Sequence, residues 1–231
     1  MSMNLIRLKD NLTRPVVLWT TGLFICACLV VFLPVGIAHK ITIPVGILTM
    51  AALWLCPWQI TLALLFSVIG DYTGSCGQFI GQMGFFAAAH IMYVIYFIRR
   101  YLEKVERDRK LSMKAKGYLA MVCFCVVGLL ATSIFKIAPL VPAGLVRIGV
   151  IIYTVVICFM LVMALLQRSS LFALGAVLFV FSDFILAWNM FVEPVPHSSY
   201  MILVPYFLAQ WLLFIRATPY RVAPEMRIMR F

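Results

Sequence analysis

Charged residues are scarce in this sequence, and acidic residues are the scarcest of them. Asp, Glu, Lys and Arg together make up 12% of the 231 residues, and eight of these residues are acidic. Hydrophobic residues make up 65%, compared with about 45–50% in a typical soluble domain. This composition excludes a soluble globular domain. We predict an integral membrane protein.

The seven cysteines lack the spacing of a metal or redox site. Two C-x-C pairs, at Cys26 and Cys28 and at Cys123 and Cys125, lie within apolar segments. Residues i and i+2 of a helix point to different sides, so neither pair can supply two ligands to one tetrahedral metal ion. We predict no metal and no cofactor, and interpret the cysteines as buried apolar residues.

Basic residues outnumber acidic ones, with 19 Lys and Arg and a net charge of +11. A charge of this size would fit nucleic-acid binding if the basic residues formed one patch. Instead they lie in short segments between apolar runs, which indicates membrane topology. We therefore predict no nucleic-acid partner.

Apolar segments long enough to cross a hydrocarbon core of about 30 Å recur along the chain. Pro57 favours a break between the second and third, because proline removes a backbone donor and clashes with the preceding turn. The first run is longer than a signal-peptide core, so we interpret it as a retained span. The sequence predicts an all-α bundle of eight transmembrane helices in a single membrane domain, 1–231. The predicted spans are about 15–34, 41–57, 58–75, 79–98, 117–135, 145–166, 171–190 and 199–217.

The basic residues predict the orientation of this bundle. Eight spans place both termini on one side, together with sixteen Lys and Arg, and leave only Lys40, Lys136 and Arg147 on the other. By the positive-inside rule, both termini are cytoplasmic. The segment 99–116 is then a basic cytoplasmic linker between two halves of four spans. We predict a multi-pass protein of the cell membrane, in bacteria the inner membrane.

Two aspartates are predicted to lie inside the membrane. Asp71 and Asp183 end the similar stretches LLFSVIGD and VLFVFSD, in the third span of each half, which allows a four-plus-four parallel pseudo-repeat. Each aspartate lies about 20 Å from the cytoplasmic end of its helix. A carboxylate in hydrocarbon costs several kcal/mol unless it is protonated, paired or hydrogen-bonded. A functional role for both is therefore the favoured hypothesis.

Other polar side chains are predicted near this depth. Tyr153 and Tyr206 lie about 10–12 Å below the outer face, and His90 and Gln210 about 16 Å below it. Lys40 and Arg147 lie near the outer rim. These residues would surround one polar site if their helices turn them inward. Alternatively, residues such as Ser182 and Gln210 form hydrogen bonds that hold helices together.

The two carboxyl groups allow more than one chemistry. If they lie close together, one can remain protonated while the other is ionised, as in two-carboxylate hydrolases. A proton-coupled transporter of small molecules or lipids would use the same residues. A purely structural role is the second alternative.

Several motifs resemble the YhhN-like lysoplasmalogenase family of multi-span membrane proteins. The first is Gly70-Asp71, followed by Gly84 and by the H-x-x-Y-x-x-Y spacing of His90, Tyr93 and Tyr96. The later ones are the S-D-x-x-L-A pattern from Ser182 and Asp183 to Leu186 and Ala187, the pair Tyr206 and Gln210, and more faintly Tyr153 and Met160.

This resemblance implies hydrolysis of the vinyl ether bond of lysoplasmalogens to a fatty aldehyde and glycerophosphoethanolamine or glycerophosphocholine. It implies acid/base catalysis by Asp71 and Asp183, without assigning which is the acid. Membrane lipids and a lysophospholipid substrate are the implied partners, with no obligatory protein partner. The residues expected to orient the substrate or the aspartates are Lys40, His90, Tyr93, Tyr153, Tyr206, Gln210 and Ser182.

Overall fold

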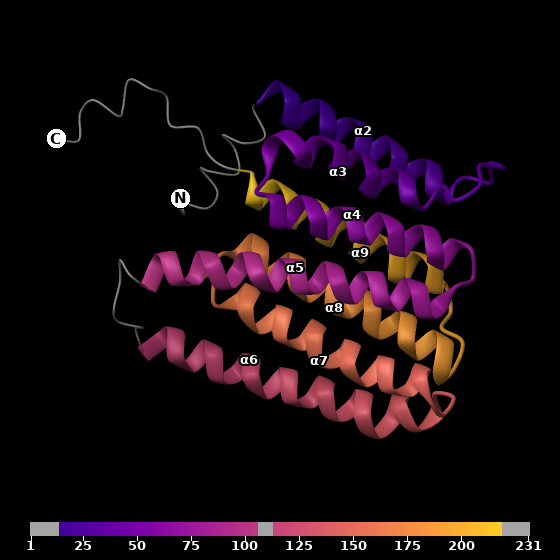
Figure 1. Cartoon of the computed structure of the whole chain (residues 1–231), viewed down its shortest axis with the longest axis vertical. Coiled ribbons are helices and arrows are strands. Elements are labelled where there is room, and N and C mark those ends of the chain that lie inside the picture. The colour runs from indigo at the N-terminus through magenta and orange to yellow at the C-terminus, as the bar shows by residue number, and fades with distance from the viewer. Residues whose placement is uncertain (1–13, 106–112, 219–231) are drawn as a thin grey trace.

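A computed structural model describes residues 14–105 and 113–218, which form a bundle of eight α-helices without a strand (Figure 1). The helices are α2 (Pro15–Phe32), α3 (Thr42–Leu55), α4 (Trp58–Ser75), α5 (Phe79–Val105), α6 (Met113–Thr132), α7 (Leu145–Leu165), α8 (Ser170–Phe191) and α9 (Ser198–Ala217). A short π-helix, η1 (Ser133–Ile137), and a 3₁₀-helix, η2 (Ala138–Leu140), follow α6. The predicted all-α fold is confirmed.

The helices run back and forth, so α2 begins and α9 ends at the same end of the bundle (Figure 1). We call this the terminal end. The opposite end, which holds the α4–α5, α6–α7 and α8–α9 turns, is the far end. The predicted linker, 99–116, falls at the terminal end: α5 continues to Val105, α6 begins at Met113, and 106–112 lie outside the described residues.

Proline ends one helix where the sequence predicted a break. α3 ends at Leu55 and α4 begins at Trp58, with Pro57 as its N-cap in an extended conformation (ψ 147°). At the N-cap, proline has no intrahelical hydrogen bond to lose, whereas inside a continuous helix it would remove one. The separation of these two helices is therefore confirmed.

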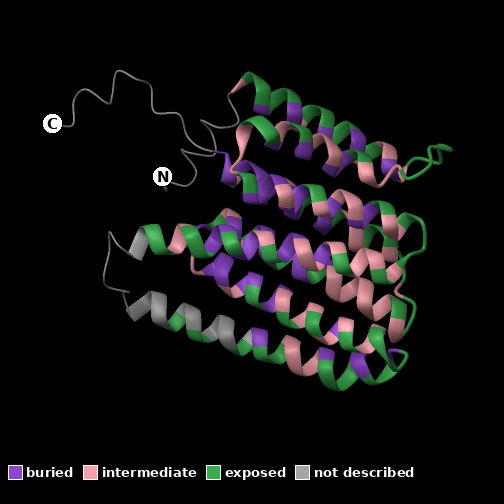
Figure 2. Ribbon diagram, in the orientation of Figure 1, coloured by how far each residue is buried: buried purple, intermediate pink, exposed green. Residues whose placement is uncertain are grey.

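The lateral surface of the bundle is apolar. Trp19 on α2 is 75% exposed and Phe124 on α6 is 80% exposed, and exposed residues occur on central helices such as α5 as well (Figure 2). Large apolar side chains facing outward suit a hydrocarbon environment rather than water. Five helices, α2, α5, α7, α8 and α9, are long and apolar enough to cross a membrane. The chain is a multi-pass membrane protein.

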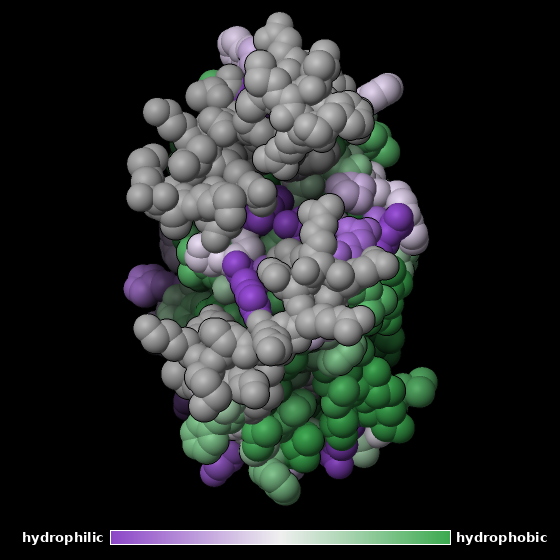
Figure 3. All heavy atoms as spheres, turned by 90° about the vertical axis from the view of Figure 1, so that its left-hand side faces the viewer, coloured by the Kyte–Doolittle hydropathy of each residue, from purple (hydrophilic) through white to green (hydrophobic). Residues whose placement is uncertain are grey.

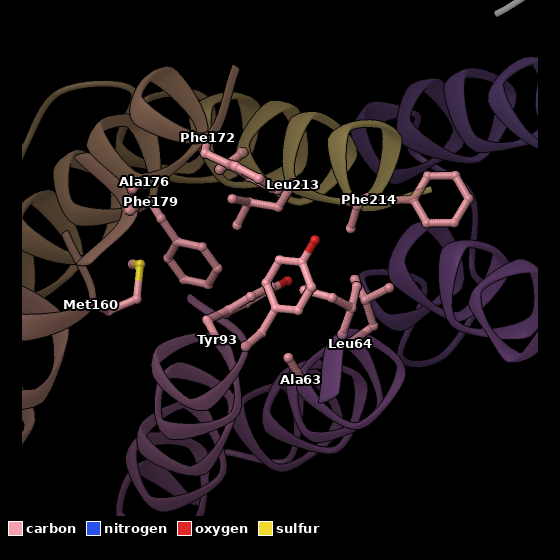
Figure 4. Packing of buried hydrophobic residues seen from close by; sticks show 14 of the residues in the cluster. Ala63, Leu64, Tyr93, Met160, Phe172, Ala176, Phe179, Leu213 and Phe214 are labelled. Carbon is pink, nitrogen blue, oxygen red and sulfur yellow. The ribbon is translucent and has the colours of Figure 1, made fainter. Parts of the chain in front are cut away.

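The central helices carry the core. α2 and α6 lie at opposite edges, α4 packs along α5, and α8 packs along α9 (Figure 1). α5 also contacts α7, and α9 contacts α3. Figure 4 shows Tyr93 within the core, between Phe179 of α8 and Leu64 of α4. The candidate site residues therefore lie on the helices with the most interior positions.

Small residues bring α4 and α5 close together beside Asp71. A Cβ atom added at Gly70 would lie 3.2 Å from the Phe86 ring, and one added at Gly74 would lie 2.5 Å from the Gln82 side chain. Glycine at these positions lets two helices approach more closely than larger residues would allow. This contact places the Phe86 ring next to the helix that carries Asp71.

The two ends of the bundle differ in charge from its flank. Figure 3 views the terminal end, where hydrophilic residues gather near the middle and hydrophobic residues cover the flank below. The helix ends located there carry Arg14, Arg99, Arg100, Arg168 and Arg216. The basic residues at this end thus lie at helix ends, while the lateral surface is mostly apolar.

Candidate functional site

Asp71 lies inside the bundle and is only 3% exposed. Its Oδ2 accepts a hydrogen bond of 2.8 Å from the Tyr206 hydroxyl on α9. One turn further along α9, the Gln210 carbonyl oxygen accepts a 2.8 Å bond from the Tyr93 hydroxyl on α5. These four residues form the Asp71 group, which connects α4, α9 and α5 through buried polar contacts.

Asp183 belongs to a different set of contacts, which we call the Asp183 group. Its Oδ2 accepts a hydrogen bond from the Tyr153 hydroxyl on α7. His90 Nε2, on α5, lies 3.1 Å from the Tyr153 oxygen and 3.4 Å from Asp183 Oδ2. Because the Tyr153 proton is directed at Asp183, His90 Nε2 fits the role of donor to both oxygens. The carboxyl, phenol and imidazole thus share one proton network.

Aromatic rings lie between the two groups. The Phe179 ring is 4.6 Å from His90 and 5.4 Å from Tyr206, measured between centroids. The Phe86 ring is 5.7 Å from Tyr206. Within the described residues no hydrogen bond joins Asp71 to Asp183. Each carboxyl group has its own tyrosine instead of the other carboxyl group as its partner.

The Asp183 group opens onto a cavity. A pocket with about 740 Å³ of empty space, including its open part, lies between α5, α6, η1, α7 and α8, and Asp183 and Tyr153 are among its lining residues. Asp183 is 10% exposed through its side chain, whereas His90 behind it is fully buried. Most other lining residues are apolar, including Phe86, which also touches Tyr206. The pocket therefore presents one carboxyl group to an apolar ligand.

The remaining predicted residues are placed elsewhere. The Ser182 hydroxyl donates a 2.8 Å hydrogen bond to the Ile202 carbonyl, which joins α8 to α9 one turn before Tyr206. Lys40 donates to the Leu33 carbonyl in the α2–α3 connection. The Arg147 guanidinium bonds to the Val141 carbonyl at 2.7 and 3.0 Å. None of these three side chains lines the pocket, so they are not brought together with Asp183 in the described part of the chain.

Sequence reasoning missed the walls of the site. Phe86 could have been predicted from the sequence, because it precedes His90 by one helical turn and so lies on the same face of α5. Gln82, Met83 and Ser133 also line the pocket, but nothing in their local sequence indicates it. In residues 14–105 and 113–218, no cluster of three or more His, Cys, Asp or Glu could hold a metal ion.

Sequence comparisons relate this chain to known proteins. The lysoplasmalogenase TMEM86B of Homo sapiens is 29% identical over 159 residues, and that of Sus scrofa is 28% identical over 155. The alignments cover 67% and 65% of this chain but 61% and 59% of the relatives, so the chain spans about three fifths of their length. No solved structure matches. Residues 38–217 match the YhhN family, and the chain belongs to that family.

Proposed function

We propose that this protein is an intramembrane hydrolase that cleaves the vinyl ether bond of a lysoplasmalogen-type lipid. The products would be a fatty aldehyde and glycerophosphoethanolamine or glycerophosphocholine. The two relatives named lysoplasmalogenase support the class of reaction. The observation that carries the proposal is the position of Asp183 in an otherwise mostly apolar pocket, with Tyr153 and His90 hydrogen-bonded to it.

The first step requires an acid next to an apolar chain. Tyr153 and His90 both contact Oδ2 of Asp183, which leaves Oδ1 to carry the proton. A protonated Asp183 would transfer this proton to the vinylic carbon, converting the enol ether into an oxocarbenium ion. The resulting carboxylate is stabilised by the Tyr153 and His90 hydrogen bonds. The apolar walls would hold the alkenyl chain so that its double bond meets the acid.

The second step returns the proton. Water adds to the carbon bonded to the ether oxygen and gives a proton to the Asp183 carboxylate. The product of this addition is a hemiacetal. In the collapse of the hemiacetal, the hydroxyl proton passes to the glycerol oxygen as the bond to that oxygen breaks, which releases the aldehyde and an alcohol. Asp71 does not line the pocket and is hydrogen-bonded to Tyr206, whose ring contacts Phe86 and Phe179, so we propose that it acts by its charge, stabilising the cation from outside the pocket.

We further propose the membrane arrangement in which this chemistry takes place. All eight helices would cross the cell membrane as one domain, with both termini cytoplasmic and membrane lipids as surroundings and substrate. The arginines at the terminal end support this orientation. In a four-plus-four repeat α3 corresponds to α7 and α5 to α9, so the α5–α7 and α3–α9 contacts correspond to each other, which supports a parallel pseudo-repeat.

The proposal is tested with purified protein in detergent or liposomes. The protein is incubated with a lysoplasmalogen and, separately, with the saturated alkyl ether of the same headgroup, and the products are measured by mass spectrometry. We expect aldehyde from the alkenyl lipid only, and none from an Asp183→Asn variant that still folds. Movement of labelled lipid across liposomes with no covalent change would instead indicate a transporter and overturn the proposal.

A further inference from the structure

The pocket extends from Asp183 to the far end of the bundle. Its residues at that end include Phe79, the first residue of α5, and Phe191, the last residue of α8, whose rings meet edge to face at 5.3 Å. Asp183 precedes Phe191 by eight residues on α8, which corresponds to about 12 Å along the helix. We call the end of the pocket at Phe79 and Phe191 the mouth. A lipid bound with its vinyl ether at Asp183 can therefore direct its headgroup toward the mouth.

Two residues of opposite charge flank the mouth. Lys136 lies on η1, and its neighbours Ser133 and Ile137 line the pocket. Glu193 follows Phe191 by two residues, at the start of the α8–α9 connection. η1 contacts α8, and Figure 1 shows the α6–α7 and α8–α9 turns at the same end. Ile137 and Phe191 also belong to one hydrophobic cluster, so each charge lies one or two residues from apolar side chains that meet at this end of the pocket.

The side chains of Lys136 and Glu193 are both exposed, but they differ in their hydrogen bonding. The Trp188 indole N–H donates a 3.2 Å hydrogen bond to Glu193 Oε1, which fixes the direction of the carboxylate. Among the described residues Lys136 makes no ion pair or hydrogen bond through its side chain, with Glu193 or any other residue. Trp188 also packs 5.8 Å from Phe184, a pocket-lining residue. The carboxylate thus stands beside an aromatic cluster.

We propose that Lys136 and Glu193 determine the headgroup specificity of this pocket by binding the two charges of a zwitterionic phospholipid headgroup. This inference rests on the proposed function. Lys136 provides an ammonium for the phosphate, and Glu193 provides a carboxylate for the headgroup ammonium. Trp188 and Phe191 add aromatic faces, which attract ammonium groups. A π-helix such as η1 is a local irregularity often found at functional sites.

The test compares two alkenyl lysolipids that differ only in the headgroup: one carries ethanolamine, and the other carries glycerol, which has no ammonium. Glu193→Gln is expected to raise KM about three- to tenfold for the ethanolamine lipid and to leave the glycerol lipid unchanged. Lys136→Gln is expected to raise KM for both lipids by a similar factor, because both carry the phosphate. kcat should not change, since neither residue contacts the reacting bond.

Two matched controls come from the terminal end of α5. Arg99 and Glu103 form an exposed i,i+4 pair at 3.6 Å, and their Gln variants remove the same charges far from the mouth. Equal KM changes in Glu103→Gln and Glu193→Gln, or a Glu193→Gln effect of equal size on both lipids, would overturn the proposal.

Binding of the saturated ether lysolipids, measured by thermal shift with both headgroups, tests the site without catalysis. If no lipid is cleaved but Glu193→Gln still weakens binding of the ethanolamine form alone, the headgroup site stands and the proposed hydrolysis fails. If cleavage occurs and the variants bind both headgroups like the wild type, hydrolysis stands and the headgroup site fails.

Discussion

The Asp71 and Asp183 groups share an aspartate–tyrosine pair but place it in different surroundings. Each has an aspartate that accepts a hydrogen bond from a tyrosine on a neighbouring helix. Asp71 is shut inside the core, whereas Asp183 faces a pocket and has a histidine as its second partner. The comparison indicates that only a carboxyl group within reach of a ligand can give it a proton, whereas one shut inside the core can act on the ligand only through its charge and through the helices that it connects.

Replacing Asp183 should have the largest effect. Asp183→Asn removes the proposed acid but keeps the shape and the hydrogen-bond acceptor for Tyr153, so kcat for aldehyde release should fall by about 10²- to 10⁴-fold. Mass spectrometry of the products measures the rate, and thermal unfolding in detergent checks that the variant folds. Near-normal aldehyde release would reject Asp183 as the acid.

The two tyrosines should separate activity from stability. Tyr153→Phe removes a donor to Asp183 at the pocket, so we expect kcat to fall about 10- to 100-fold with little change in melting temperature. Tyr206→Phe leaves Asp71 without its hydroxyl partner inside the core, which should lower the free energy of unfolding by about 1–3 kcal/mol. Activity and thermal unfolding are measured on both. If both variants lost activity and stability to the same extent, the proposed difference in role between the two groups would be wrong.

Asp71→Asn should have a smaller effect on kcat than Asp183→Asn. A charge acting across roughly 10 Å at an effective dielectric of about 20 contributes 1–2 kcal/mol, so a decrease of about tenfold is expected. Steady-state kinetics on the alkenyl lipid measures it. A loss as complete as that of Asp183→Asn would instead place both carboxyl groups in direct contact with the substrate.

The smallest effect should come from the shape of the pocket. A Cβ added at Gly149 on α7 would lie 2.3 Å from the terminal methyl of Met83, a flexible pocket-lining side chain that must then move. Gly149→Ala should change KM two- to fivefold, as expected for about 1 kcal/mol of altered packing. Gly128→Ala on α6, where a Cβ meets no neighbour within 4 Å, is the control. Equal KM values for both variants would show that Met83 does not shape the substrate site.

Much of the architecture was predictable from local sequence. The lack of charge predicts a membrane protein, Pro57 predicts the break between α3 and α4, and the motifs around Asp71 and Asp183 indicate the YhhN family. Depth along a helix follows from residue number, since each residue adds about 1.5 Å. These features depend on each segment separately, so no knowledge of its neighbours is needed.

The partners of the aspartates were less accessible to sequence reasoning. His90, Tyr153, Tyr206 and Gln210 were all candidates, but their division into two groups depends on how each helix is rotated. That rotation follows from contacts such as Phe86 against Gly70, which join residues far apart along the chain. Lys40 shows the same limitation, because its predicted depth says nothing of the Leu33 carbonyl to which it bonds.

The sequence by itself determined the helical class of this protein, its membrane character and the presence of two carboxyl groups within apolar helices, because hydrophobicity and helix breaking act locally. The tertiary structure decided which of the two faces a pocket. Asp71 and Asp183 are equivalent in hydropathy and depth, and only the packing of α5, α7 and α9 around them gives one a cavity and the other a buried partner. Such packing depends on side-chain shape across several helices, which no local pattern encodes.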